Sequence, residues 1–196
     1  DNDEAIAFIN EDEKTIRLSY RELKGQVAAL ACYLKSQGVV KGDRIAAYLP
    51  NTEKTIIAML ATTSLGAVWS SCSPDFGVPG VVDRLSQVKP KVLFVTDGYL
   101  HKGKVFEMSE KNQAVLSALG SVGVAIMTPL LDNGTSHMYA AVGFADIQRD
   151  YEGADLVFEQ IGFNEPLYIL FSSGTTGVPK CIVHGVGGTL LQHLKE

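Results

Sequence analysis

The stretch with the clearest chemistry reads SSGTTGVPK and runs from residue 172 to residue 180. Its glycines let the backbone curl so that several amide N–H groups point inward and form a nest for anions. Its hydroxyl side chains add neutral donors that can follow phosphate oxygens, and its lysine adds a mobile positive charge. A site for a triphosphate needs these three properties together, so we expect this loop to bind polyphosphate.

A second stretch, GYLHKGKV at residues 98–105, matches the glycine and lysine positions of a Walker P-loop. It departs from that pattern at Val105, which has no hydroxyl to bind magnesium. SSGTTGVPK is not a Walker loop either, because Pro179 separates Gly177 from Lys180. A phosphotransferase built on GYLHKGKV is therefore only a remote alternative.

Apolar runs alternate with helical patterns along most of the chain, and this alternation predicts how the loop is positioned. Short loops join the two kinds of segment, as is typical of a parallel sheet covered by helices on both faces. The predicted fold is thus α/β, with a mostly parallel sheet flanked by helices. The predicted strands are RIAAYL, AVWSSC, KVLFVTD, SVGVAIM and EPLYILFSS, and the loop directly follows the last of them. Ligands collect at the carboxyl ends of strands in open α/β sheets.

The first forty residues are predicted in more detail. AIAFIN and TIRLS surround the charged turn EDEK and should form a hairpin. Ser19 and Glu22 have the spacing of a capping box, which predicts that a helix begins here. Leu23, Val27, Leu30 and Leu34 form one apolar stripe along that helix, and Gly38 is its expected C-cap. The weakest pattern lies between residues 98 and 150, where VGFADIQRD is compatible with helix or strand.

Composition excludes several classes of function. Apolar residues make up 46% of the 196-residue chain, which is typical of a globular protein, and the net charge is −5. A binder of nucleic-acid backbone would normally carry a basic face, so we expect no nucleic-acid partner. We expect no membrane span, because no apolar run is long enough. The acidic start lacks a signal-peptide pattern, and three widely spaced cysteines suggest buried, reduced thiols in the cytosol.

The loop and its surroundings resemble the adenylate-forming enzymes, the superfamily of acyl-CoA synthetases, luciferases and peptide-synthetase adenylation domains. The resemblance covers ILFSSGTTGVPK, and upstream SYRELKGQVAALACYLKSQGVVKGDRIAAYLPN and AMLATTSLGAVWSSCSP. Within the superfamily, SPDFGVPGVVDRLSQVKPKVLFVTDGYLHKGK is most similar to the acetoacetyl-CoA synthetases. This resemblance implies a two-step ligase: ATP and acetoacetate give an acyl-adenylate and pyrophosphate, and CoA then displaces AMP.

The resemblance also implies roles for particular residues. The loop would hold the ATP phosphates through Ser172, Ser173, Gly174, Thr175, Thr176, Gly177 and Lys180. Lys104 matches a basic position that contacts the nucleotide end of CoA in the acetyl-CoA relatives, whereas His101 stands where an arginine is usual. The family needs Mg²⁺, but no residue of this chain is an evident metal ligand. We expect Trp69 to lie in the core.

The resemblance further implies that residues 1–196 are a partial amino-terminal AMP-binding domain. The carboxy-terminal part of that domain and the mobile small domain would be absent, so the chain alone should be a poor catalyst. The strand YILFSS should then lie on an unpaired sheet edge. Two alternatives stay open: another short-chain acyl-CoA synthetase, or a non-catalytic, truncated nucleotide-binding module.

Overall fold

The structure, a computed structural model, describes residues 2–131, 141–173 and 177–195. The strands are β1 (Glu4–Ile9), β2 (Thr15–Ser19), β3 (Arg44–Tyr48), β4 (Val68–Cys72), β5 (Val92–Val95), β6 (Gly98–His101), β7 (Lys104–Glu107), β8 (Val124–Met127), β9 (Ala141–Gly143), β10 (Pro166–Ser172) and β11 (Lys180–Gly185). The helices are α1 (Tyr20–Ser36), α2 (Glu53–Ser64), α3 (Val78–Val88), α4 (Ser109–Ala118), α5 (Phe144–Asp150) and α6 (Val186–Lys195). In this part of the chain, no helix is long and apolar enough to cross a membrane.

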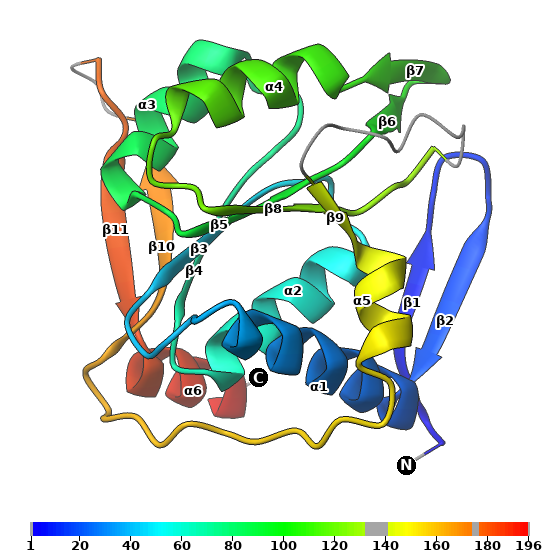
Figure 1. Cartoon of the computed structure of the whole chain (residues 1–196), viewed down its shortest axis with the longest axis vertical. Helices are drawn as coiled ribbons and strands as arrows, with labels where there is room; N and C mark the ends of the chain where they lie inside the picture. Colours follow the sequence, from blue (N-terminus) through cyan, green and yellow to red (C-terminus); the bar gives the residue numbers. More distant parts are fainter. Residues whose placement is uncertain (1, 132–140, 174–176, 196) are drawn as a thin grey trace.

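A central sheet of seven strands organises the fold, in the order β11-β10-β4-β3-β5-β8-β9. Neighbouring strands run parallel throughout, except for the antiparallel pair of β10 and β11. Helices α1, α2 and α5 lie on one side of this sheet and α3 and α4 lie on the other (Figure 1). The predicted α/β class, with a mostly parallel sheet flanked by helices, is confirmed.

The central strands are buried on both faces because successive side chains point to opposite sides. Along β3, Ile45 and Ala47 join the core under α1 and α2, whereas Ala46 and Tyr48 join the core under α3 and α4. The first core also contains Trp69, as predicted. This double burial explains why the predicted strands read as nearly continuous apolar runs.

The predicted amino-terminal hairpin and capping box are confirmed. Strands β1 and β2 pair antiparallel, and the Ser19 hydroxyl accepts from the Glu22 amide at 3.2 Å, while the Glu22 carboxylate accepts from the Ser19 amide at 2.8 Å. Helix α1 ends at Ser36, with Gln37 as its cap residue. The prediction that Gly38 is the C-cap is therefore wrong by one residue: Gly38 follows the cap at φ +74°, in the left-handed conformation that favours glycine.

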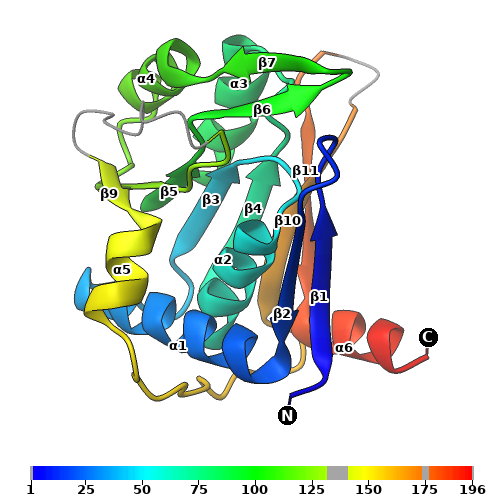
Figure 2. The ribbon, with the colours of Figure 1, turned by 90° about the vertical axis from the view of Figure 1, so that its right-hand side faces the viewer.

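The prediction that YILFSS lies on an unpaired sheet edge is wrong. Strand β10 pairs with β4 on one side and with β11 on the other, so β11 is the terminal strand on this side of the described sheet. The sequence KCIVHG, which forms β11, was not predicted as a strand. It runs antiparallel to β10 and covers the edge that the prediction left open (Figure 2).

Smaller corrections concern helices and cysteines. Helix α3 begins at Val78, inside the segment predicted to be a loop, and α4 was not predicted at all. The ambiguous VGFADIQRD divides between β9 and α5. All three cysteines are free, but only Cys72 is buried, so the expectation of buried thiols is wrong for Cys32 and Cys181.

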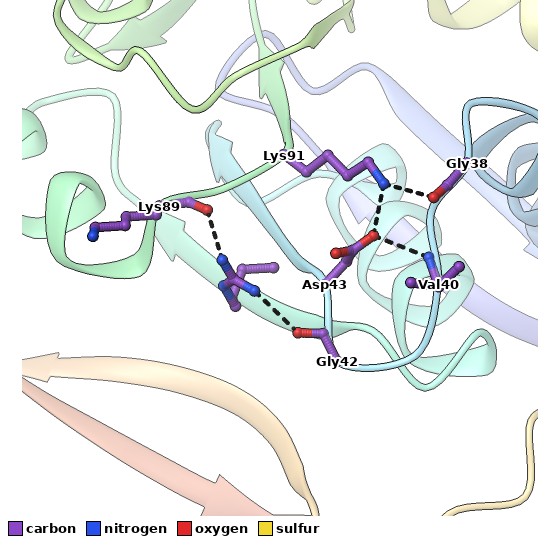
Figure 3. A network of polar contacts seen from close by, with 7 residues as sticks. Gly38, Val40, Gly42, Asp43, Lys89 and Lys91 are labelled. Carbon is purple, nitrogen blue, oxygen red and sulfur yellow. Dashed lines mark hydrogen bonds and ion pairs between the residues drawn. The ribbon is translucent and has the colours of Figure 1, made fainter.

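A polar network joins the loops that precede β3 and β5. The Lys91 ammonium donates to the Gly38 carbonyl at 2.6 Å and to the Asp43 carboxylate at 2.9 Å (Figure 3). Asp43 also accepts from the Val40 amide at 3.0 Å. Partial burial alone would raise the pKa of Asp43, but the Lys91 hydrogen bond and charge and the Val40 amide together lower it. This network fixes the amino ends of the strands, opposite the edge where the loop lies.

Candidate nucleotide-binding site

The SSGTTGVPK loop connects β10 to β11 at the carboxyl edge of the parallel strands. Ser172 at the end of β10 is paired with Lys180 at the start of β11. Gly174, Thr175 and Thr176 lie outside the described residues. Of the other predicted phosphate-binding residues, Ser172 is half-buried, and Ser173, Gly177 and Lys180 are exposed. The structure therefore presents the two ends of the loop to solvent.

The backbone of the loop needs glycine at position 177. Gly177 has φ +111°, a conformation that residues with a side chain rarely adopt. Pro179, two residues later, is buried, and Lys180 begins β11 with an exposed side chain. The lysine is thus attached to a fixed strand end while its ammonium group is free to reach an anion.

The same edge contains the point where the helical connections diverge to the two faces of the sheet. Strand β3 leads into α2 on one face, and its neighbour β4 leads into α3 on the other. Such a switch point leaves a crevice outside the strand ends, where ligands bind in α/β folds. A cavity of about 300 Å³ lies there, lined by Leu49, Pro50, Asn51, Thr55, Ser71, Cys72, Ser73, Pro74, Asp75, Tyr99 and His101.

Tyr48, which the sequence analysis did not single out, holds one wall of this cavity. Its buried hydroxyl donates to the carbonyls of Phe76 at 2.5 Å and Pro74 at 3.3 Å, which fixes the loop after β4. Burial raises the pKa of Tyr48 to about 12, and burial also raises the pKa of Cys72 to about 12. Both groups are protonated at neutral pH, so they serve here as packing and hydrogen-bonding groups. A tyrosine at the end of a buried strand was the available signal.

The GYLHKGKV stretch forms the β6–β7 hairpin, which argues against a P-loop. Lys102 and Gly103 both have positive φ, at 53° and 70°, as in the two-residue turns that close hairpins. A P-loop would instead lead from a strand into a helix. The structure thus rejects the strand–loop–helix context that a phosphotransferase of that kind requires.

Glu11, in the β1–β2 turn, supports the tip of this hairpin. Its carboxylate accepts from the Gly103 amide at 3.0 Å and lies 3.9 Å from the His101 Nδ1. Hydrogen bonds from the Gly103 and Lys102 amides lower the pKa of Glu11. His101 lines the switch-point cavity, while Lys104 is exposed on the other strand of the hairpin. The structure therefore places Lys104 beside the cavity-lining strand, but not in the cavity wall.

Asp97 is a second residue that the sequence analysis missed. The residue is 2% exposed, and its carboxylate accepts from the Leu130 amide at 2.7 Å and from the Leu131 amide at 3.2 Å. Its backbone carbonyl accepts from the Met108 amide at 2.9 Å. Asp97 thus ties together the carboxyl end of β5, the end of the β6–β7 hairpin and the segment after β8. Within the described ranges, no three His, Cys, Asp or Glu residues are grouped to hold a metal.

Known proteins provide an independent comparison. The chain matches the family of AMP-binding enzymes over residues 1–195. It is 48% identical to an acetoacetyl-coenzyme A synthetase of Rhizobium meliloti over 98% of the chain, and 40% identical to an acetoacetyl-CoA synthetase of Macaca fascicularis over 100% of the chain. It spans about 30% of the length of each of these relatives.

A solved structure agrees with these sequence matches. The acetoacetyl-CoA synthetase of Streptomyces lividans superimposes with a TM-score of 0.89 and 40% sequence identity, over 96% of this chain and 29% of that one. The family match covers nearly every residue, including the loop between β10 and β11. The chain therefore belongs to the AMP-binding enzyme family.

Proposed function

We propose that this chain is the amino-terminal part of an acetoacetate–CoA ligase. The full protein would join ATP and acetoacetate into an acyl-adenylate with release of pyrophosphate. The sulfur of CoA would then attack the acyl carbon, so that acetoacetyl-CoA forms and AMP leaves. One observation carries the proposal: a loop rich in glycine and hydroxyl residues, ending in Lys180, follows β10 at the carboxyl edge of the sheet. The relatives that this chain matches over nearly its whole length are named acetoacetyl-CoA synthetases.

The loop is suited to the first half-reaction. When the carboxylate attacks the α-phosphorus, negative charge builds on the departing pyrophosphate. Donors and cations that already surround the β- and γ-phosphates stabilise that charge without reorganising. We assign this role to the exposed ammonium of Lys180 and the hydroxyls of Thr175 and Thr176. Backbone or hydroxyl donors would come from Ser172, Ser173, Gly174 and Gly177.

We assign Lys104 to the phosphorylated adenosine end of CoA. It is exposed on β7, and the paired strand β6 contributes Tyr99 and His101 to the switch-point cavity. A cation at this place could attract the phosphates of CoA while the thiol arm points toward the crevice. His101, close to Glu11, does not supply the permanent charge of the arginine that is usual at that position.

Mg²⁺, which the resemblance implies, is assigned to no residue of this chain. The described ranges offer no cluster of carboxylates, histidines or cysteines for it. We also propose that the full protein works in the cytosol, which agrees with three free thiols in the described structure. The alternatives are a ligase for another short acyl chain and a nucleotide-binding module without catalysis.

The test is to express the full-length protein that contains this chain and to measure AMP release with ATP, Mg²⁺ and CoA. Acetoacetate should be the preferred acid over acetate, propionate and butyrate. Preference for another short acid would replace the substrate but keep the ligase. Binding of ATP without AMP release for any acid would favour the non-catalytic module and contradict the proposal.

A further inference from the structure

Helix α3 contacts both β10, which leads into the SSGTTGVPK loop, and β11, which follows it. We propose that Arg84 and Gln87, one helical turn apart on α3, are positioning residues that fix Lys180 and the end of β10 for phosphate binding. This inference rests on the proposed function of the loop. Neither residue is proposed to touch ATP. Both would orient the loop through their contacts with the residues at its two ends.

Gln87 contacts the residues on both sides of Lys180. Its Nε2 donates to the Pro179 carbonyl at 3.0 Å, and its Oε1 lies 3.7 Å from the Cys181 sulfur, which donates to it. The same Nε2 donates to the Asp83 carbonyl at 2.8 Å, which holds the amide against its own helix. One amide side chain therefore holds the backbone carbonyl immediately before the lysine and the thiol of the residue immediately after it. These two contacts constrain the direction in which the lysine leaves the strand.

Arg84 acts at the other end of the loop. Its guanidinium carbon lies 4.3 Å from the centre of the Phe76 ring and 5.9 Å from that of the Phe171 ring, both within the range of cation–π contact. Phe171 directly precedes Ser172, the first residue of the predicted site. Phe76 belongs to the loop that Tyr48 fixes beside the switch-point cavity. Arg84 thus lies close both to the end of β10, which leads into the SSGTTGVPK loop, and to the loop after β4 beside the cavity.

Helix α3 is rigid enough to serve as a support. Its residues Val81, Leu85 and Val88 are buried in the core against the sheet. Arg84 is also held by a hydrogen bond from its Nη1 to the Gly80 carbonyl at 2.6 Å. Residues 84 and 87 are neighbours on the helix surface because they are three apart, so one face of α3 meets both ends of the loop.

The experiment measures the two half-reactions separately in the full-length ligase. Gln87→Ala should raise the KM for ATP in acetoacetate-dependent pyrophosphate exchange by about 3- to 10-fold, the usual effect of one hydrogen bond. The thioester step from preformed acyl-adenylate should change less. Gln87→Glu, which keeps the length but loses the donor, should behave like Gln87→Ala. Ser86→Ala, on the exposed side of the same helix, is the matched control and should leave exchange unchanged.

A double variant separates positioning from general stability. If Gln87 acts through Lys180, Gln87→Ala should have little further effect on exchange in a Lys180→Ala background. Arg84→Lys should keep much of the exchange activity that Arg84→Ala loses, because it keeps a cation near the two rings. Additive effects of Gln87→Ala and Lys180→Ala, or equal loss in both half-reactions, would overturn this inference alone. Unchanged exchange in Lys180→Ala itself would overturn the proposed role of the loop.

Discussion

Replacing Asp97 by alanine should destabilise the fold more than any other single carboxylate change at this edge of the sheet. The Asp97 carboxylate is almost fully buried and accepts from the amides of Leu130 and Leu131. Hydrogen bonds to a charged group contribute about 1.5–3 kcal/mol each, and both amides would be left without this acceptor. Leu130 and Leu131 are half-buried, so water can replace part of the loss. We therefore expect a loss of about 2–4 kcal/mol in the free energy of unfolding.

Urea denaturation of the 196-residue chain measures this loss directly. Asp97→Asn keeps one acceptor oxygen but presents an NH₂ group to the second amide, so its loss should be intermediate. Asp83→Ala, on the exposed surface of α3, is the matched control and should change stability by less than about 0.5 kcal/mol. If Asp97→Ala cost no more than this control, the Asp97 hydrogen bonds would not be what stabilises this edge of the sheet.

Three further predictions concern the amino edge, the CoA contact and catalysis. Lys91→Ala should cost about 0.5–1 kcal/mol, since the pair with Asp43 is partly exposed. Because folding lowers the Asp43 pKa, the pair stabilises the folded chain at any pH above the ordinary aspartate pKa. This stabilisation is lost as the pH falls through the lowered pKa of the folded state. Urea titrations near neutral pH and near pH 3 should therefore show the difference shrinking in acid. In the full-length ligase, Lys104→Glu should raise the KM for CoA and leave that for ATP unchanged; an unchanged CoA dependence would contradict the assignment. The 196-residue chain alone should release no AMP above background, because positioning of reactants supplies about 7–11 kcal/mol of the barrier and most of it would come from other sequence. Turnover by this chain within about tenfold of a complete ligase would show that the catalytic groups are misplaced.

The elements that could be predicted from the sequence are those with strong local signals. The Ser19–Glu22 capping box fixes the start of α1 through contacts three residues apart. The buried strands around Ile45 and Phe94 are apolar on both faces, so their pattern is clear without knowledge of their neighbours. The mostly parallel sheet with helices on both faces follows from the alternation of strand and helix, whereas the order of the strands does not.

The elements that could not be predicted depend on distant partners. Strand β11 is exposed or half-buried throughout, and its pairing with β10 decides its structure. Helix α4 buries only Asn112 and Val115, so its apolar stripe is faint. The hairpin at residues 98–107 resembled a P-loop in its glycine and lysine spacing. Its turn was not predicted, because a lysine in the sequence does not indicate the left-handed conformation that Lys102 adopts.

In the candidate site, too, the local pattern could be predicted from the sequence and the contacts with distant elements could not. The glycine and hydroxyl pattern before Lys180 predicted an anion site from residue types alone. The supports of that site come from other elements: Gln87 and Arg84 from α3, and Tyr48 from β3. No local pattern marks these residues, because their roles arise only when the chain folds.

We propose that the loop between β10 and β11 serves the adenylation half-reaction. The most direct measurement compares acetoacetate-dependent pyrophosphate exchange with thioester formation from preformed acyl-adenylate, in the full-length ligase and in its Thr176→Ala, Lys180→Ala double variant. Loss of charge stabilisation on the departing pyrophosphate should slow exchange strongly, while thioester formation should suffer much less. Equal loss in both half-reactions, or unchanged exchange, would contradict this role of the loop.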